Sequence, residues 1–329
     1  MKRREFIVLL GCTASLPLAA QAQQPMPVIG YLGGGFLSTV QGTGGQHAVD
    51  AFESGLREMG FVAGQNLAIE YRWAENRPER LPGLVADLVR RRVGIICASS
   101  NVTTLAVKKV NSEIPLVFAV GLDPVAMGLV STINRPGGNA TGVYFLTTVL
   151  EPKRLELMRV LLPHVAVVAA LVNPDNPNAE NHIKDLQAAA RTFGLQLQVL
   201  KLREVADFDT AFATLVQQKI GAVLVTSDSL FDSNRGRLVE LAARNAIPVM
   251  YPWRDFVEAG GLLSYGNSLN GVYRQVGLYA GRILKGDKPG DLPVWVPTRF
   301  EFVLNLKTAK ALGLEIPAKL LAFADEVIE

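Results

Sequence analysis

The same pattern appears twice in the chain, over residues 92–120 and 222–250, and this repeat restricts the possible folds more than any other feature. Each copy has a short apolar run, a polar corner, a helix-forming stretch and an Ile-Pro pair that opens a second apolar run. The apolar runs are rich in β-branched residues and bounded by turn formers, which is typical of buried parallel strands. The predicted strands are Val93–Cys97, Ile114–Phe118, Ala222–Val225 and Ile247–Met250.

The repeat extends towards the N-terminus of each copy. Helices are predicted to end at Gly60 and Gly194, because glycine commonly follows the last helical residue. A strand is predicted after each helix and another before it, at Leu67–Tyr71, Leu197–Leu200, Val28–Leu32 and Val167–Leu171. A β-α-β-α-β run that occurs twice predicts an α/β protein with two Rossmann-like lobes, each built on a parallel sheet.

The polar corners of the two copies are the first candidate binding residues. Ser99, Ser100 and Asn101 follow the first strand of one copy, and Ser227 and Asp228 follow that of the other. Ligands of open α/β sheets bind outside the carboxyl ends of the strands, so facing lobes would place both corners in one cleft. A second interpretation stays open, in which Ser100 and Asp228 only cap helices.

Five further candidates are placed by their position at or beyond strand ends. The three tyrosines among them are expected to supply aromatic walls, and one asparagine an adaptable amide. One aspartate is an alternative to Asp228. These candidates are Asp123, Tyr144, Asn173, Tyr251 and Tyr265. The helix that begins near Asn101 offers free N–H groups and a favourable dipole to a ligand carboxylate. Asp228 would then suit an ammonium group or a hydroxyl.

Composition excludes several classes of function. The 329 residues suffice for two ordinary domains, and 49% hydrophobic with 19% charged residues describe a normal core-forming protein. The net charge of +3 comes without a basic stripe that carries interleaved aromatics, so nucleic acid is not an expected partner. The expected cargo is a small organic molecule.

Cysteine and histidine are too few and too scattered for a catalytic or metal centre. The two cysteines are Cys12 and Cys97, and the histidines His47, His164 and His182 have no H-x-x-x-H spacing. A transition-metal site and a Cys–His or Ser–His catalytic arrangement therefore have no support. We expect no cofactor, no metal and no enzymatic activity.

The N-terminus has the three parts of a secretory signal peptide. Met1–Ala22 combines a basic start, an apolar run and an Ala-Gln-Ala cleavage site, which predicts cleavage near Ala22/Gln23 and a periplasmic product. The Arg3–Ile7 stretch is similar to a twin-arginine signal, although the general export route stays open. Lipidation of Cys12 is a further alternative, and no later stretch reaches the ~20 apolar residues of a membrane span.

Several segments together resemble a known family. They are Arg3–Ile7 with the following Ala-Gln-Ala-Gln-Gln, Asp123–Val125, Thr141–Val143, Leu263–Gly266, Tyr279–Gly286, Phe302–Gly313 and Ala324–Glu329. The chain is similar over nearly its whole length to ABC-transporter substrate-binding proteins of the tryptophan/tyrosine-uptake type. The resemblance implies a type I periplasmic binding protein fold with three crossovers between the lobes.

The same resemblance gives the expected domain limits and partners. The signal peptide would cover residues 1–22, the first lobe 26–142 plus 266–298, and the second lobe 143–265 plus 299–329. The expected role is a monomeric receptor that closes on an amino-acid-like, possibly aromatic ligand and delivers it to an ABC permease. The alternative is a ligand-sensing regulator or signalling receptor of the same fold.

Overall fold

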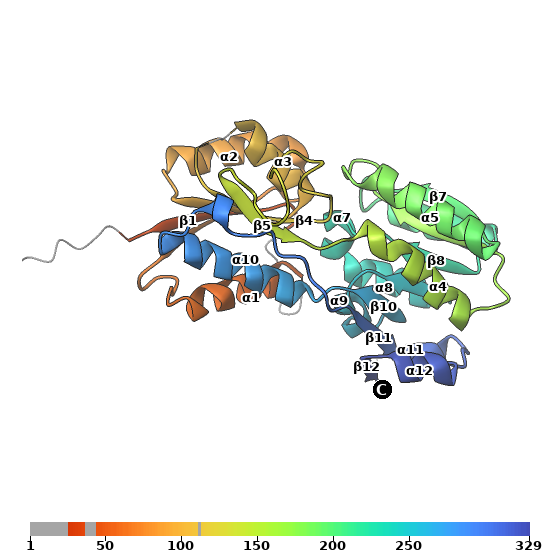
Figure 1. Ribbon diagram of the computed structural model, residues 1–329. Helices are drawn as coiled ribbons and strands as arrows, with labels where there is room; N and C mark the ends of the chain where they lie inside the picture. The colour runs from red at the N-terminus through yellow and green to blue at the C-terminus, as the bar shows by residue number, and fades with distance from the viewer. Residues whose placement is uncertain (1–25, 37–43, 111–112) are drawn as a thin grey trace, which may run out of the picture.

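The computed structural model describes residues 26–36, 44–110 and 113–329. The predicted signal peptide, with Cys12 and the cleavage site, lies outside the described residues. The described chain forms two α/β lobes that lie end to end (Figure 1). No helix in the described ranges is long and apolar enough to cross a membrane.

The first lobe is built on a parallel five-stranded sheet with the order β2-β1-β3-β4-β5. Its strands are β1 (Val28–Gly33), β2 (Ala68–Trp73), β3 (Ile95–Ala98), β4 (Leu116–Val120) and β5 (Ala140–Tyr144). Its helices are α1 (Gly44–Glu58), α2 (Leu81–Arg90), α3 (Asn101–Val110) and α10 (Leu269–Leu284), with the short 3-10 helices η1 (Pro78–Arg80) and η3 (Pro289–Asp291). Helices α2 and α3 cover one face of the sheet, and α1 and α10 cover the other (Figure 1).

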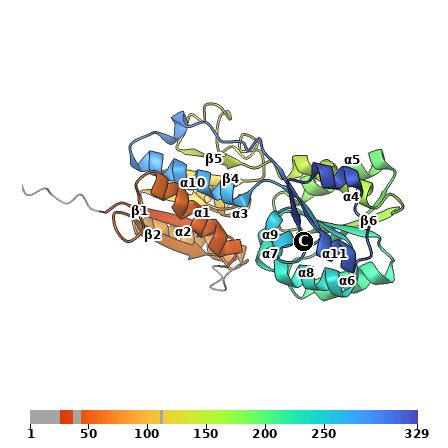
Figure 2. The ribbon, with the colours of Figure 1, turned by 90° about the horizontal axis from the view of Figure 1, so that it is seen from below.

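The second lobe has a seven-stranded sheet with the order β12-β11-β10-β9-β8-β6-β7. Its strands are β6 (Val167–Val172), β7 (Gln196–Lys201), β8 (Ala222–Val225), β9 (Val249–Tyr251), β10 (Leu263–Gly266), β11 (Glu301–Asn305) and β12 (Glu326–Ile328). Its helices are η2 (Thr148–Leu150), α4 (Glu151–Leu161), α5 (Ala179–Phe193), α6 (Asp207–Gln217), α7 (Ser229–Ser233), α8 (Arg235–Arg244), α9 (Arg254–Glu258), α11 (Leu306–Ala311) and α12 (Ala318–Phe323). Helices α4 and α5 lie on one face of this sheet, and α6 and α8 on the other (Figure 2).

The predicted repeat and its parallel strands are confirmed, and the second sheet carries two further strands at its C-terminal end. There β11 pairs antiparallel with β10, and β12 continues in the direction of β11. The glycines that follow α1 and α5 have the predicted left-handed conformation, with φ of 85° at Gly60 and 67° at Gly194. Each of these helices therefore ends where the sequence indicated.

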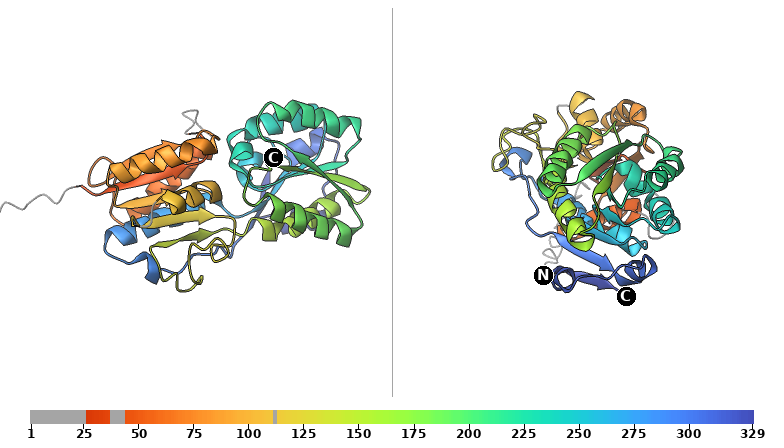
Figure 3. Two further views of the ribbon diagram at one scale, coloured as in Figure 1. Left: turned by 90° about the horizontal axis from the view of Figure 1, so that it is seen from above. Right: turned by 90° about the vertical axis from the view of Figure 1, so that its right-hand side faces the viewer.

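The chain crosses between the lobes three times. It leaves the first sheet after β5, returns after β10 to form α10, and leaves again between η3 and β11 (Figures 1 and 3). Three crossovers and two parallel-sheet lobes are the architecture that the sequence predicted. The exact lobe limits given above stay a prediction.

The first lobe depends on a close contact between α1 and α10, which are distant in sequence. A Cβ atom added to Gly277 would overlap the carbonyl oxygen of Phe52, and one added to Gly55 would overlap that of Arg274. The two backbones can approach this closely only because both positions are glycine. The segment that returns from the second lobe is thereby packed onto α1.

Candidate ligand-binding site

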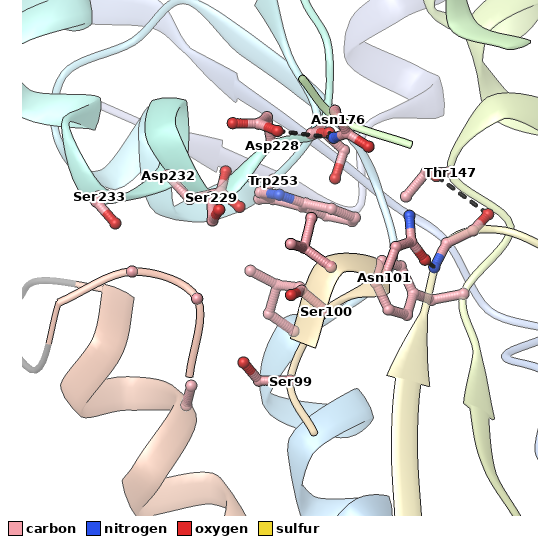
Figure 4. A pocket seen from close by; sticks show the side chains of 18 of the residues that line it. Ser99, Ser100, Asn101, Thr147, Asn176, Asp228, Ser229, Asp232, Ser233 and Trp253 are labelled. Atoms are coloured by element: carbon pink, nitrogen blue, oxygen red, sulfur yellow. Dashed lines mark hydrogen bonds between the residues drawn. The ribbon is translucent and has the colours of Figure 1, made fainter. Parts of the chain in front are cut away.

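A cavity of about 140 Å³ lies between the lobes, at the carboxyl ends of strands from both sheets (Figure 4). The two polar corners singled out by the repeat line it from opposite sides. Ser99, Ser100 and Asn101 come from the first lobe, and Ser227 and Asp228 from the second. A cleft at this end of parallel strands is where open α/β sheets bind ligands.

The first-lobe wall includes the start of α3, and the polar side chains there already make hydrogen bonds within the protein. Ser100 Oγ accepts from the backbone N–H of Thr103 at 3.3 Å, and Thr103 Oγ1 accepts from the N–H of Ser100 at 3.0 Å. Asn101 Oδ1 accepts from the N–H groups of Gly121 (2.9 Å) and Leu122 (3.2 Å). Ser100 is therefore a helix cap, and Asn101 fixes the loop after β4.

On the second-lobe wall, Asp228 caps the short helix α7. Its carboxylate accepts from the N–H of Leu230 (2.8 Å) and from the amides of Asn173 (3.0 Å) and Asn176 (2.7 Å). Burial raises the pKa of this carboxyl, and the hydrogen bonds from Asn173, Leu230 and Asn176 act against that rise. Asp228 is therefore a helix cap, and Asn173 and Asn176 hold its carboxylate in place.

Replacing Asp228 by alanine is expected to lower the free energy of unfolding by about 2–4 kcal/mol. The loss combines a helix cap, worth about 1 kcal/mol, with the amide of Asn173, at about 1–3 kcal/mol for a polar group left without its partner, whereas Asn176 keeps its bond to the Ser227 carbonyl. Chemical denaturation measures it, and calorimetry with the bound ligand should show only a minor change in affinity. Asn305→Ala is the matched control, because Asn305 caps α11 away from the cavity. Loss of binding without loss of stability would instead make Asp228 a ligand contact.

Two further carboxylates on the same wall have fewer hydrogen-bond partners in the protein than Asp228 has. Asp232 and Asp255 line the cavity together with Asp228. Burial raises the pKa of Asp232 well above its ordinary value, and the charges of Asp228 and Asp255 add to the rise, whereas Arg235 and the nearby indole N–H of Trp253 oppose it. Sequence reasoning missed Asp232, because one turn of a short helix gives no periodic signal.

Aromatic side chains form much of the cavity surface. They are Tyr31, Phe36, Trp73, Phe145, Trp253, Phe256 and Tyr273. Tyr31 lies 5.6 Å from Trp73 between ring centroids, and Phe145 lies 6.0 Å from Trp253, so the rings gather into one group in each wall. Such rings supply broad apolar contact for a flat ligand and a negative face for a cation.

The aromatic residues proposed from sequence lie elsewhere. Tyr144 and Asp123 line a neighbouring pocket of about 250 Å³, which meets the main cavity at Gly121. Tyr251 is fully buried and stacks on Phe256 with centroids 4.7 Å apart, and Tyr265 packs against Phe300 at 6.0 Å. None of these four side chains is among the residues that line the main cavity.

The glycines after β1 bring the first lobe against the second. A Cβ on Gly34 would lie 3.3 Å from Ser100 Oγ and 3.5 Å from Ser229 Oγ, and one on Gly35 would overlap Ser233 Oγ. Ser229 and Ser233 belong to α7, so this loop closes one side of the cavity. Residues 37–43, which come next in the chain, lie outside the described residues.

A buried charged cluster supports the cavity next to the crossovers. Arg154, Glu151 and His182 are each at most 1% exposed, with Arg154 Nη1 3.1 Å and His182 Nδ1 2.6 Å from Glu151 Oε1. Arg154 also donates to the carbonyl oxygens of Tyr265 (2.7 Å) and Thr147 (3.4 Å). Thr147 follows β5 and Tyr265 lies in β10, so one guanidinium ties together the starts of two crossovers.

The site offers polar and aromatic groups for binding. Among the described residues, no cluster of His, Cys, Asp and Glu side chains could hold a metal ion. Cys97 is fully buried in β3, and burial raises the pKa of its thiol. The arrangement can enclose a small organic molecule between two walls.

Comparison with known proteins agrees with this geometry. The chain is 25% identical over 268 residues to a tyrosine-binding protein of Clostridioides difficile (strain R20291), covering 82% of this chain and 77% of that one. A conserved domain protein of Vibrio cholerae is 26% identical, with a TM-score of 0.81 over 92% of this chain and 99% of the other. An ABC domain of Streptococcus pneumonia in complex with L-Trp is 24% identical, with a TM-score of 0.82 and the same coverages.

The family assignment follows from the extent of the match. The family model described as ABC transporter substrate binding protein matches residues 35–328, which includes all three crossovers, the second lobe and the first lobe after β1. The fold, the cavity between the lobes and this match lead to one conclusion. The chain belongs to the ABC transporter substrate-binding protein family.

Proposed function

We propose that this protein is the periplasmic receptor of an ABC importer for a small aromatic, amino-acid-like molecule. The observation that carries the proposal is the cavity between the lobes, with aromatic walls and polar groups at the strand ends. The name of the tyrosine-binding relative supports an aromatic amino acid as the ligand class. The sequence of the predicted signal peptide supports export.

The geometry suggests how such a receptor would work. Because both lobes contribute walls, a ligand makes its full set of contacts only when the lobes are closed, and its binding shifts the population towards that state. The three crossovers are the segments about which the lobes would hinge. A permease in the inner membrane would then recognise the closed receptor and accept the ligand.

The proposal includes release of the ligand in unchanged form. Within the described chain, no hydrogen bond joins a histidine or lysine side chain to the cavity residues Ser99, Ser100, Ser227, Ser229 and Ser233. Activation of a serine requires such a base within hydrogen-bond reach. A ligand-sensing regulator of the same fold is the alternative, and it would require a signalling partner in place of a permease.

Binding is expected to stabilise the mature protein, recovered from the periplasmic fraction, without chemical conversion of the ligand. A ligand that binds only the native state adds about 2.7 kcal/mol at a hundredfold excess over Kd. Thermal unfolding with L-tyrosine, L-phenylalanine and L-tryptophan measures the shift, and mass spectrometry identifies molecules released from the purified protein. Recovery of a converted product, or the absence of any bound or stabilising small molecule, would contradict the proposal.

A further inference from the structure

The second-lobe wall of the cavity carries an excess of negative charge. Asp228, Asp232 and Asp255 line it, whereas the only Arg or Lys among the described lining residues is Arg235. Arg235 Nη1 donates to the backbone carbonyl of Asp232 at 3.3 Å. Three carboxylates beside one guanidinium favour a ligand that brings positive charge.

The three carboxylates differ in how many hydrogen-bond or ion-pair partners the protein gives them. Asp228 accepts three hydrogen bonds, as described above, and Asp255 Oδ1 lies 3.7 Å from His47 Nδ1. Asp232 Oδ1 is buried and has no hydrogen-bond partner within the described chain. An unpaired buried carboxylate oxygen is costly, so a partner from outside the protein is the expected explanation.

Two nearly fully buried side chains that line the same cavity are also unsatisfied. Trp253 is 2% and Tyr31 1% exposed, and both line the cavity. Neither the indole N–H nor the hydroxyl has a partner with hydrogen-bond geometry within the described chain, although the indole lies near enough to Asp232 to lower the pKa of its carboxyl. Figure 4 shows the indole nitrogen of Trp253 beside Asp232, without a hydrogen bond drawn between them. The cavity thus presents an acidic acceptor, unsatisfied polar edges and aromatic faces in one place.

We propose that Asp232 binds a cationic nitrogen of the ligand, so that the cargo is a protonated amine. This inference rests on the proposed function and specifies its ligand class. A protonated amine would supply the hydrogen-bond donor that Asp232 Oδ1 lacks and would balance part of the charge of the three carboxylates. The aromatic rings of Trp253 and its neighbours add cation–π attraction to the same group.

The proposal predicts selection by the amine and not by the carboxylate of the ligand. Three probes separate these groups on one aromatic ring: L-tyrosine has both, tyramine has only the amine, and 3-(4-hydroxyphenyl)propionate has only the carboxylate. Calorimetry on the wild-type protein is expected to show binding of L-tyrosine and tyramine. The propionate is expected to bind weaker by about 30-fold or more, the loss typical of removing one partner of a buried charge pair.

Asp232→Asn tests the residue itself, because it keeps the shape of the side chain and removes its charge. We expect the variant to lose about 30-fold or more in affinity for the amines and to bind the propionate at least as well as the wild type does. Asp209→Asn is the matched control, since Asp209 pairs with Arg237 on the exposed surface of α6 and should leave all affinities unchanged. The wild-type comparison of the three probes decides the amine preference even if Asp232→Asn does not fold.

The outcomes separate this inference from the proposed function. Equal affinity for the propionate and tyramine, or undiminished amine binding by Asp232→Asn, overturns the inference while the receptor role stands. If none of the three probes binds, the cargo released from the purified protein decides: a basic nitrogen supports the inference, and its absence overturns it. A protein that yields and binds no small molecule contradicts both proposals.

Discussion

Replacing Arg154 by methionine is expected to lower the free energy of unfolding by about 3–5 kcal/mol, the usual cost of breaking a buried ion pair from one side. Arg154 and Glu151 are both fully buried, and their charged atoms are 3.1 Å apart. The variant would leave the Glu151 carboxylate in the interior with only His182 beside it. Urea denaturation near neutral pH measures the loss.

The pH dependence of this effect has a definite sign. Burial alone would raise the pKa of Glu151, but Arg154 and His182 together lower it below its ordinary value. The pair therefore stabilises the native state above the ordinary glutamate pKa, about 4.3, and this contribution disappears as the pH falls through the lowered value. The difference between wild type and Arg154→Met should accordingly shrink in acid.

A double variant supplies the control for Arg154→Met. In Arg154→Met/Glu151→Leu both charges are absent, and replacing a whole buried pair with apolar residues is often nearly neutral. We expect the double variant to recover much of the lost stability. The two crossovers that start near Thr147 and Tyr265 should nevertheless become more mobile in both variants, because the hydrogen bonds from Arg154 to their carbonyl oxygens are lost. A single variant within about 1 kcal/mol of wild type would contradict the role assigned to the pair.

Gly277→Ala is expected to destabilise the first lobe, although alanine is normally the better helix former. The new Cβ would overlap the carbonyl oxygen of Phe52, so α1 and α10 would have to separate along their contact. Overpacking of this kind costs about 1–3 kcal/mol or more, and the gain in helix propensity, about 1 kcal/mol, offsets only part of it. Thermal unfolding monitored by circular dichroism measures the net loss.

Gly236→Ala is the matched control, because the same substitution should there have the opposite sign. Gly236 lies in α8, and a Cβ at this position would meet no described atom within 4 Å. The expected result is a gain of up to about 1 kcal/mol from helix propensity. If both alanine variants raise the melting temperature, the close contact between α1 and α10 does not limit stability.

The repeat in the sequence was sufficient to predict the architecture of the two lobes. Strand β8 has the predicted bounds, Ala222–Val225, and Gly60 and Gly194 terminate their helices with positive φ. These features depend on neighbours in the chain: β-branched runs, turn formers and the freedom of glycine. The position of each polar corner at the carboxyl edge of its own sheet also follows, whereas a common cavity was predicted only on the condition that the lobes face each other.

Tertiary packing decided which aromatic and acidic side chains reach the cavity. Tyr31 and Tyr251 both lie in short buried strands, yet Tyr31 lines the cavity whereas Tyr251 stacks on Phe256. Asp228 and Asp232 are one helical turn apart, but local donors occupy the first and leave an oxygen of the second unpaired. The sequence indicates at which strand end a residue lies, because strands and turns depend on neighbouring residues in the chain. The direction of its side chain and its partners depend on contacts between segments far apart in sequence, which only the folded lobes bring together.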